Sequence, residues 1–296
     1  MSFGQTPLTR RRILRALAGV TAGRLIAAAA PVRPTGVRLY AVRAALKKDP
    51  DAVLHALAEI GFKEVEGYNR LETIALAPKL KQAGLNLRSC QVETPLFTAF
   101  WDPYPELKPV ALPEAIDSVA GAGAEYFTMG YISSGAREDN DDFFRRTADR
   151  MNVAAELCRK SGLKFAWQNH AFEFQGAPGR RPIDTYKQRL EPKLVELELN
   201  VFWASVAGQD PLQLLKEWKG HVPLLHLNDK AKGTPRQFSE NIAFGAFEET
   251  GSGEIDFSAI LKAASLAGVK FQFTGQDESL GDPMESLRRS FAYFNR

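Results

Sequence analysis

Several segments with the composition of buried β-strands end in side chains that can transfer protons or bind hydroxyl groups. These ends contain Glu66, Gln168-Asn169-His170, Glu198-Leu199-Asn200, His226-Leu227-Asn228-Asp229 and Gln276-Asp277-Glu278. Carboxylates and imidazoles act as general acids and bases, and amides orient a substrate through hydrogen bonds. Because a buried polar group costs free energy unless it is paired, this concentration at strand ends indicates a binding or catalytic site.

Each of these residues also has an ordinary structural explanation. His170 could be a hydrogen-bonded core histidine, and Asp277-Glu278 could cap the last helix. The aromatic side chains near the same strand ends favour a ligand, because the apolar face of a sugar ring stacks on aromatic rings while its hydroxyls bind amides and carboxylates. These aromatic residues are Trp101, Trp167, Phe172 and Trp203. The predicted ligand is therefore a small-molecule carbohydrate.

The elements that would position these side chains alternate regularly from residue 36 onward. Short β-branched or aromatic runs alternate with longer amphipathic stretches, which is typical of βα units around a parallel sheet. Strands are predicted at 37–42, 63–68, 86–92, 125–132, 164–170, 194–200, 222–229 and 270–276, and helices at 51–60, 71–83, 141–161, 211–218, 257–267 and 283–293. A glycine follows several predicted helices, where a left-handed C-cap is needed, at Gly61, Gly84, Gly162 and Gly268.

Eight strands at this spacing predict one closed barrel. The 266 residues after position 30 match the ~250 that a (β/α)8 barrel uses. The alternative, a doubly wound open sheet, normally carries a glycine-rich phosphate turn after its first strand, and Tyr40-Ala41-Val42-Arg43 is unlike one. We therefore predict an α/β fold, a single (β/α)8 TIM barrel spanning residues 36–296.

The first 30 residues have the layout of an export signal. Thr9-Arg10-Arg11-Arg12-Ile13-Leu14-Arg15 precedes a mildly apolar run that ends in four alanines. This segment resembles the twin-arginine signal, which is read by a receptor and implies a periplasmic protein exported already folded. The run is too short to span a membrane, so no membrane span is predicted. The alternatives are a disordered basic tail and an ordinary first helix.

Charge and cysteine usage narrow the function class further. The net charge of +3 comes from the first 30 residues, which hold five arginines and no acidic residue; the remainder has 33 basic against 35 acidic residues, or −2. A nucleic-acid-binding domain would place a basic field on its folded part, so no nucleic-acid partner is predicted. Cys90 and Cys158 lie far apart in the sequence, and both are predicted to be small buried side chains.

Five motifs, in order and at matching spacing, resemble the sugar phosphate isomerase/epimerase family of xylose isomerase-like TIM barrels. They are Val37–Arg43, Gly61–Glu66, Asn169–Phe174, Leu224–Lys230 and Gln276–Glu278, and Gly251–Phe257 resembles the family as well. The resemblance extends from about Gly36 to the C-terminus. It implies a barrel and a carbohydrate-like ligand, but it leaves the reaction open.

The resemblance also implies a divalent metal, Mn²⁺ or Mg²⁺, held by carboxylates and one histidine at strand ends. His226 matches the ligand histidine. Asn200 and Gly275 stand where the family has carboxylate ligands, and Gln168 begins a motif in which the family has histidine. Hard dications prefer anionic oxygen, so the usual metal site is predicted to be weakened or lost.

Two main hypotheses about function follow. The first is a sugar isomerase, epimerase or lyase that acts on a free or oxidised sugar or glycoside by proton transfer next to a carbonyl. In it, Glu66 and His226 are catalytic, and the substrate is bound by Gln168, His170, Asn200, Trp203 and Gln276. The alternative is a non-catalytic periplasmic carbohydrate-binding protein or the inactive partner of an active relative. A third hypothesis is a barrel that serves only for assembly.

The segment 231–249 carries no assignable regular structure. It contains Phe238, Phe244 and Phe247, so we expect it either to cover the pocket or to meet another subunit in a homo-oligomer. Loops of this length are usually functional or disordered.

Overall fold

Eight parallel strands close into a barrel in the computed structural model, which describes residues 1, 36–101, 108–138, 140–278 and 281–295. The barrel strands are β1 (Gly36–Arg38), β2 (Glu64–Gly67), β3 (Asn86–Val92), β4 (Tyr126–Met129), β5 (Lys164–Gln168), β6 (Val195–Asn200), β7 (Leu224–Leu227) and β10 (Phe271–Thr274). Neighbouring strands pair in parallel, and β1 closes the ring between β2 and β10. The predicted TIM barrel is confirmed.

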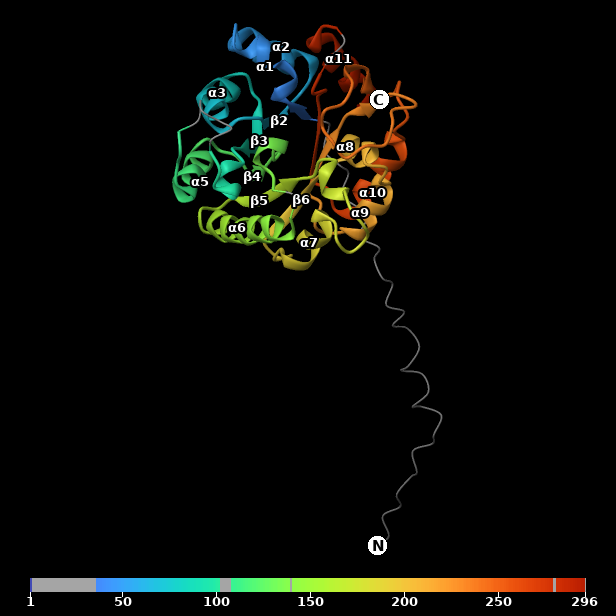
Figure 1. Ribbon diagram of the computed structural model, residues 1–296. Helices are drawn as coiled ribbons and strands as arrows, with labels where there is room; N and C mark the ends of the chain where they lie inside the picture. Colours follow the sequence, from blue (N-terminus) through green and yellow to red (C-terminus); the bar gives the residue numbers. More distant parts are fainter. Residues whose placement is uncertain (2–35, 102–107, 139, 279–280, 296) are drawn as a thin grey trace.

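Helices surround the strands, as Figure 1 shows. The longer ones are α2 (Pro50–Ile60), α3 (Arg70–Gln82), α5 (Leu112–Gly121), α6 (Asp141–Lys160), α7 (Pro182–Arg189), α9 (Pro211–Glu217), α10 (Phe257–Ala267) and α11 (Pro283–Phe294). The short helices are α1 (Arg43–Leu46), α4 (Pro95–Thr98) and α8 (Val201–Val206), with 3-10 turns at Leu39–Val42, Ser134–Ala136, Phe172–Phe174 and Phe244–Ala246. None of the helices in the described part of the chain is long and apolar enough to cross a membrane.

Local sequence signals explain the limits of several helices. Asp49 accepts a hydrogen bond from the Ala52 N–H at the start of α2, and Asp256 accepts one from Ala259 at the start of α10. Both helices end at glycines with positive φ, 116° at Gly61 and 89° at Gly268. The left-handed caps predicted from the sequence are thus confirmed at these two positions.

The structure corrects several predicted boundaries. The first strand ends at Arg38, and Leu39–Val42 forms a 3-10 turn instead of continuing the strand. The strands predicted at 125–132 and 222–229 are shorter at both ends, and Asp229 belongs instead to the short strand Asp229–Lys230. Helices α5 and α7 were not predicted at all. Each has a proline in its first turn, a position that suits a helix start although proline otherwise signals a loop.

The segment 231–249 contains more structure than predicted. Its base is a two-stranded antiparallel sheet in which β8 (Asp229–Lys230) pairs with β9 (Phe247–Glu248). Asp229 also accepts hydrogen bonds from the backbone N–H groups of Gly251, Gly253 and Ile255. These contacts hold both ends of the segment against the barrel.

The barrel interior is layered. Its lower part is apolar, filled by the buried cluster of Tyr126, Ala166, Leu224, Phe271 and Phe273. Because alternate residues of a strand share a face, the next inward positions toward the carboxyl ends of the strands follow two residues later. These positions are polar and buried, and they include Gln168, Glu198 and His226. The layering brings the polar residues of several strands to one level, directly above an apolar floor.

Candidate active site

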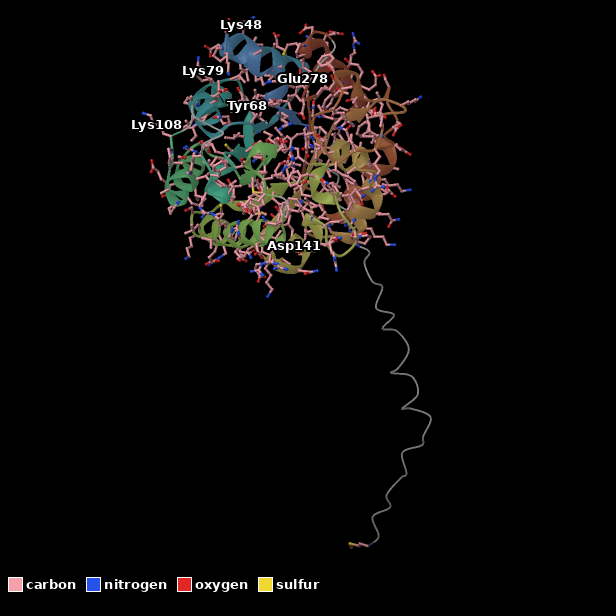
Figure 2. The ribbon with its side chains drawn as sticks, viewed as in Figure 1. Lys48, Tyr68, Lys79, Lys108, Asp141 and Glu278 are labelled. Carbon is pink, nitrogen blue, oxygen red and sulfur yellow. The ribbon has the colours of Figure 1, made fainter. Side chains whose placement is uncertain are left out.

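A cavity of about 640 Å³ lies at the carboxyl ends of the strands. It is walled by strand ends and by the loops that follow them, and residues important to its chemistry are Arg38, Tyr131, His170, Trp203, Glu240 and Asp277. Tyr68 and Glu278, which also line it, lie inside the ring of helices in Figure 2, whereas Lys48, Lys79 and Lys108 lie at its outer edge. This is the end of a TIM barrel at which active sites form.

Arg38, the last residue of β1, places a guanidinium at the base of this cavity. Its Nη1 lies 2.5 Å from Asp277 Oδ1, and its Nη2 donates to Gln91 Oε1 at 3.0 Å. Its Nε lies 3.4 Å from Glu66 Oε1. Burial opposes the charged form, but Asp277, Glu66 and Glu198 outweigh that effect and raise the pKa of Arg38. The cation is therefore permanent.

Two buried carboxyl groups lie beneath Arg38. Glu66 on β2 and Glu198 on β6 have no exposed surface, and Gln91 donates to Glu66 Oε1 at 3.3 Å. Burial raises the pKa of both groups, and the neighbouring carboxylate raises that of Glu198 further, well above its ordinary value. Since Glu66 is the one paired with Arg38, we assign the charge to Glu66 and a proton to Glu198.

His226 lies at the centre of a neutral polar cluster. Asn200 Nδ2 lies 2.8 Å from His226 Nδ1 and Gln168 Nε2 lies 3.5 Å from it, while His226 Nε2 lies 3.3 Å from the carbonyl oxygen of Gly275. These contacts fit a ring that accepts at Nδ1 and donates from Nε2 to Gly275. Burial lowers the pKa of His226 well below its ordinary value, and Arg38 lowers it further. The imidazole is neutral.

The divalent metal implied by the family resemblance does not fit this cluster. Its donors are two amides, one carbonyl and an imidazole whose two nitrogens are already in hydrogen bonds. Dications such as Mg²⁺ and Mn²⁺ favour carboxylate oxygen. Within the described residues, no group of three or more His, Cys, Asp and Glu side chains is arranged to hold a metal ion.

His170 and Trp203 are the predicted site residues that reach the cavity. Their rings lie 6.0 Å apart, and His170 also packs on Tyr131 at 4.8 Å between centroids. Within the described residues, His170 Nδ1 and Trp203 Nε1 are buried and have no hydrogen-bond partner. Burial lowers the pKa of His170 to about 3. The two rings therefore form a neutral aromatic wall of the cavity.

The other predicted site residues lie elsewhere. Glu66, Gln168, Asn200 and His226 have no exposed surface and form the layer beneath the cavity instead of its wall. Gln276 donates to the Glu248 carbonyl and accepts from Ser286 Oγ, so its side chain ties the base of the 231–249 segment to α11. The strand-end pattern therefore predicts which residues come together but not how deep each one lies.

Some cavity residues were missed as site residues. Arg38 follows the same signal as the predicted residues, a charged side chain at the end of a buried strand, but the strand was predicted to continue past it. Glu240 carries no such signal. It comes from the 231–249 segment, where its carboxylate accepts from Tyr131 Oη (3.1 Å), Arg137 Nη2 (3.1 Å) and the Phe172 N–H (3.2 Å). The segment thus covers one side of the cavity.

Comparisons with known proteins agree with this architecture. The chain is 25% identical over 261 residues to an inosose dehydratase of Clostridium perfringens, covering 80% of this chain and 86% of that protein. A sugar phosphate isomerase/epimerase structure from Parabacteroides distasonis superposes with a TM-score of 0.71 at 19% identity, covering 88% and 96% of the two chains. A 3-keto-D-glucoside 4-epimerase from E. coli superposes with a TM-score of 0.63 at 13% identity, covering 88% and 98%.

The two structural likenesses support the fold alone. The family assignment comes from the sequence, because residues 54–271 match the family described as xylose isomerase-like TIM barrel. That match covers more than half of the chain, and it includes seven of the eight barrel strands in whole or in part. This protein therefore belongs to the xylose isomerase-like TIM barrel family.

Proposed function

We propose that this protein is an enzyme that moves a proton next to the carbonyl of a small polyhydroxylated ketone, as an isomerase, epimerase or dehydratase. The observation that carries the proposal is the cavity itself. It combines a charged pair, Arg38 and Asp277, with the unpartnered ring atoms of His170 and Trp203. Its relatives include an inosose dehydratase and a 3-keto-D-glucoside 4-epimerase, whose names both denote polyhydroxylated ketones.

Asp277 is the carboxylate that we place against the reacting carbon. It lines the cavity, and burial raises its pKa although Arg38 and Arg43 oppose that shift. A carboxylate with a raised pKa is a better base for a carbon acid. Glu66 does not line the cavity but contacts two residues that do, Arg38 and Gln91, so we place it in the charge balance of the site instead of against the substrate.

The walls favour a ligand without phosphate. The cavity lining includes Glu93, Glu240, Asp277 and Glu278, and Arg38 is its single arginine or lysine among the described residues. Each of these carboxylates is paired with an arginine, so within the described residues the cavity lining has no uncompensated positive charge to offer a phosphate dianion. We therefore propose a free sugar, glycoside or cyclic polyol bearing a ketone.

The test is exchange of the carbon-bound proton with solvent. The protein is incubated in D₂O with an inosose, a 3-ketoglucoside and L-ribulose, and deuterium at the carbon next to the carbonyl is followed by NMR. We expect enzyme-dependent exchange or dehydration with at least one of the three. Asp277→Asn should abolish it, and binding without any exchange or product would overturn the assignment as an enzyme.

Trp203→Phe tests whether the cavity binds the substrate. This variant keeps an aromatic ring but removes the pyrrole part of the indole together with its Nε1–H, so we expect the dissociation constant to rise about five- to tenfold, about the value of one hydrogen bond. Trp218→Phe is the matched control, because Trp218 Nε1 also lacks a partner in the described structure but does not line the cavity. Equal affinities of the two variants would place the ligand elsewhere.

The alternative is a non-catalytic carbohydrate-binding protein or an inactive partner of an active relative. The observation that favours it is the neutral cluster around His226, which has amides and a carbonyl where the family resemblance implies charged ligands. This alternative predicts calorimetric binding of the same ketones with neither exchange nor product.

We further propose that the protein works in the periplasm; the export signal on which this rests lies outside the described residues.

A further inference from the structure

The positive charge of Arg38 lies where several acidic strand ends converge. Its guanidinium contacts Asp277 after β10, Glu66 on β2 and Gln91 on β3, and its charge also acts on Glu198 of β6. The Arg38 side chain is only 8% exposed, yet it lines the cavity. The site therefore has a fixed cation at its base, held by Asp277, Glu66 and Gln91 from three different strands or strand ends.

Some N–H groups of this guanidinium make no hydrogen bond within the described residues. Arginine carries five N–H groups, and within the described residues Arg38 makes two hydrogen bonds, one from each Nη. Each Nη therefore keeps a second N–H. Because the residue lines the cavity, these groups are the ones positioned to donate to an oxygen of a bound ligand.

Gly275 leaves room for this arrangement. Its φ is 151°, a conformation that side-chain-bearing residues rarely adopt. A Cβ there would lie 3.2 Å from the Arg38 carbonyl oxygen and 3.3 Å from Arg38 Cβ. It would also lie 3.1 Å from Ala41 Cβ, so a side chain at position 275 would crowd the end of β1 and the turn that follows it.

We propose that the Arg38 guanidinium holds the carbonyl oxygen of the substrate and stabilises the negative charge that forms there, so that the reaction needs no divalent metal. This inference rests on the proposed function. A guanidinium suits this role because it is always charged, and its N–H groups are directed by the contacts that already hold it. It would supply by hydrogen bonds the charge stabilisation that a Lewis-acidic metal supplies elsewhere.

The step balances without any further reactant. Asp277 takes the proton from the carbon next to the carbonyl, and the electron pair of that C–H bond forms a C=C bond. The carbonyl π pair moves to oxygen, and the resulting oxyanion is held by Arg38. Protonation of the opposite face of the carbon by solvent water gives an epimer as the oxyanion pair re-forms the carbonyl, and Asp277 loses its proton to solvent. In dehydration, the proton held by Asp277 goes instead to the hydroxyl group that leaves the next carbon, and re-formation of the carbonyl gives water and an unsaturated ketone.

The first test compares variants in the D₂O exchange assay, in buffer containing EDTA. We expect the wild-type rate to be unchanged by EDTA and kcat of Arg38→Ala to fall about 10²–10³-fold, the effect of removing one oxyanion donor, with a smaller change in KM. Methylguanidinium should restore part of the lost rate. Arg88→Ala is the matched control, because Arg88 is likewise an ion-paired arginine on a barrel strand, with Glu125 as a partner, but does not line the cavity.

Three results would overturn the inference. They are loss of wild-type exchange in EDTA with recovery on adding Mn²⁺, equal rates for Arg38→Ala and Arg88→Ala, and absence of rescue by methylguanidinium in a folded Arg38→Ala protein. Should Arg38→Ala not fold because Glu66 and Asp277 lose their partner, Arg38→Ala/Glu66→Gln removes one positive and one negative charge together. The same comparison then applies to that variant.

A binding measurement separates this inference from the proposed function. Calorimetry with D-gluconate and D-sorbitol compares a carboxylate with its neutral counterpart. We expect the wild type to prefer gluconate and Arg38→Ala to lose that preference. If no ketone undergoes exchange, the proposed function fails, while an Arg38-dependent preference still shows that Arg38 binds a ligand oxyanion. An unchanged preference in Arg38→Ala overturns the role of Arg38 whatever the exchange assay gives.

Discussion

At the scale of single residues, the site consists of buried charged groups whose charges must balance one another. Removing one partner of a buried ion pair typically costs about 3–5 kcal/mol, because the other charge is left uncompensated. Arg38 is the shared partner of Glu66 and Asp277. The proton on Glu198 removes a further charge that the site could not balance. The neutral histidines follow the same logic, since a second and third cation would compete with Arg38 for the same carboxylates.

The buried state of His170 predicts a measurable pH dependence of stability. Its folded-state pKa of about 3 lies below the ordinary value of 6.5, so between these values the unfolded chain binds a proton that the folded chain does not. Stability is therefore lost as the pH falls below 6.5, by up to about 1.4 kcal/mol per pH unit. We expect urea unfolding to show that wild type loses about 2 kcal/mol more than His170→Asn between pH 7 and pH 5. Parallel pH profiles for the two proteins would contradict this.

At the scale of elements, the sequence predicts best where periodicity and punctuation agree. The strand Asn86–Val92 and the helix Phe257–Ala267 have the predicted limits, because each has a continuous pattern and a clear stop. The end of β1 was misplaced because Leu39–Val42 is as apolar as a strand. Only the packing of the closed barrel turns it into a helical turn.

In the candidate site, too, some features could be predicted from the sequence and others could not. Their position at strand ends predicted that Gln168, Asn200 and His226 lie at one end of the barrel, and the structure joins the three side chains by hydrogen bonds. Depth is a different property. Whether a residue at that end meets the cavity or lies beneath it depends on strand stagger around the ring, which involves all eight strands. Glu240 could not be found at all, because its position depends on a long loop that crosses the barrel mouth.

The segment 231–249 should act as a cover that Glu240 holds in place. Glu240→Ala removes three hydrogen bonds to the opposite wall, so we expect faster proteolytic cleavage in the segment and a KM about tenfold higher, with kcat changed less. Glu240→Gln keeps an acceptor oxygen, so its cleavage rate and KM should lie between those of the wild type and Glu240→Ala. Lys232→Ala, at an exposed position of the same segment, is the control. Unchanged cleavage and KM in Glu240→Ala would show that the segment is held by other contacts.

At the scale of the whole molecule, the barrel is closed, with each of its eight strands paired on both sides. A domain of this kind has no open edge of its main sheet to pair with another chain. Its family match extends over most of the barrel. The homo-oligomer considered from the sequence stays a prediction. Covering the cavity is a role for segment 231–249 that requires no second subunit.

We propose that the folded barrel is exported through its twin-arginine signal. Conservative replacement of the twin arginines, Arg10→Lys/Arg11→Lys, should leave folding and any activity unchanged but retain the protein in the cytoplasm, because the signal is read by a receptor and not by its charge alone. Cell fractionation of a bacterial host measures this. Arg24→Lys, outside the motif, is the matched control. Periplasmic recovery of the double variant at wild-type levels would refute the assignment.

The closed base of the covering segment has a consequence for how this scaffold could acquire new specificities. The β8–β9 pairing and the hydrogen bonds of Asp229 to Gly251, Gly253 and Ile255 fix both ends of the segment independently of what lies between them. We therefore expect that the stretch 231–246 can be exchanged for one of another length or sequence without disturbing barrel closure. Grafting alternative stretches between these anchors would change which ligands are enclosed while the buried polar layer beneath stays intact.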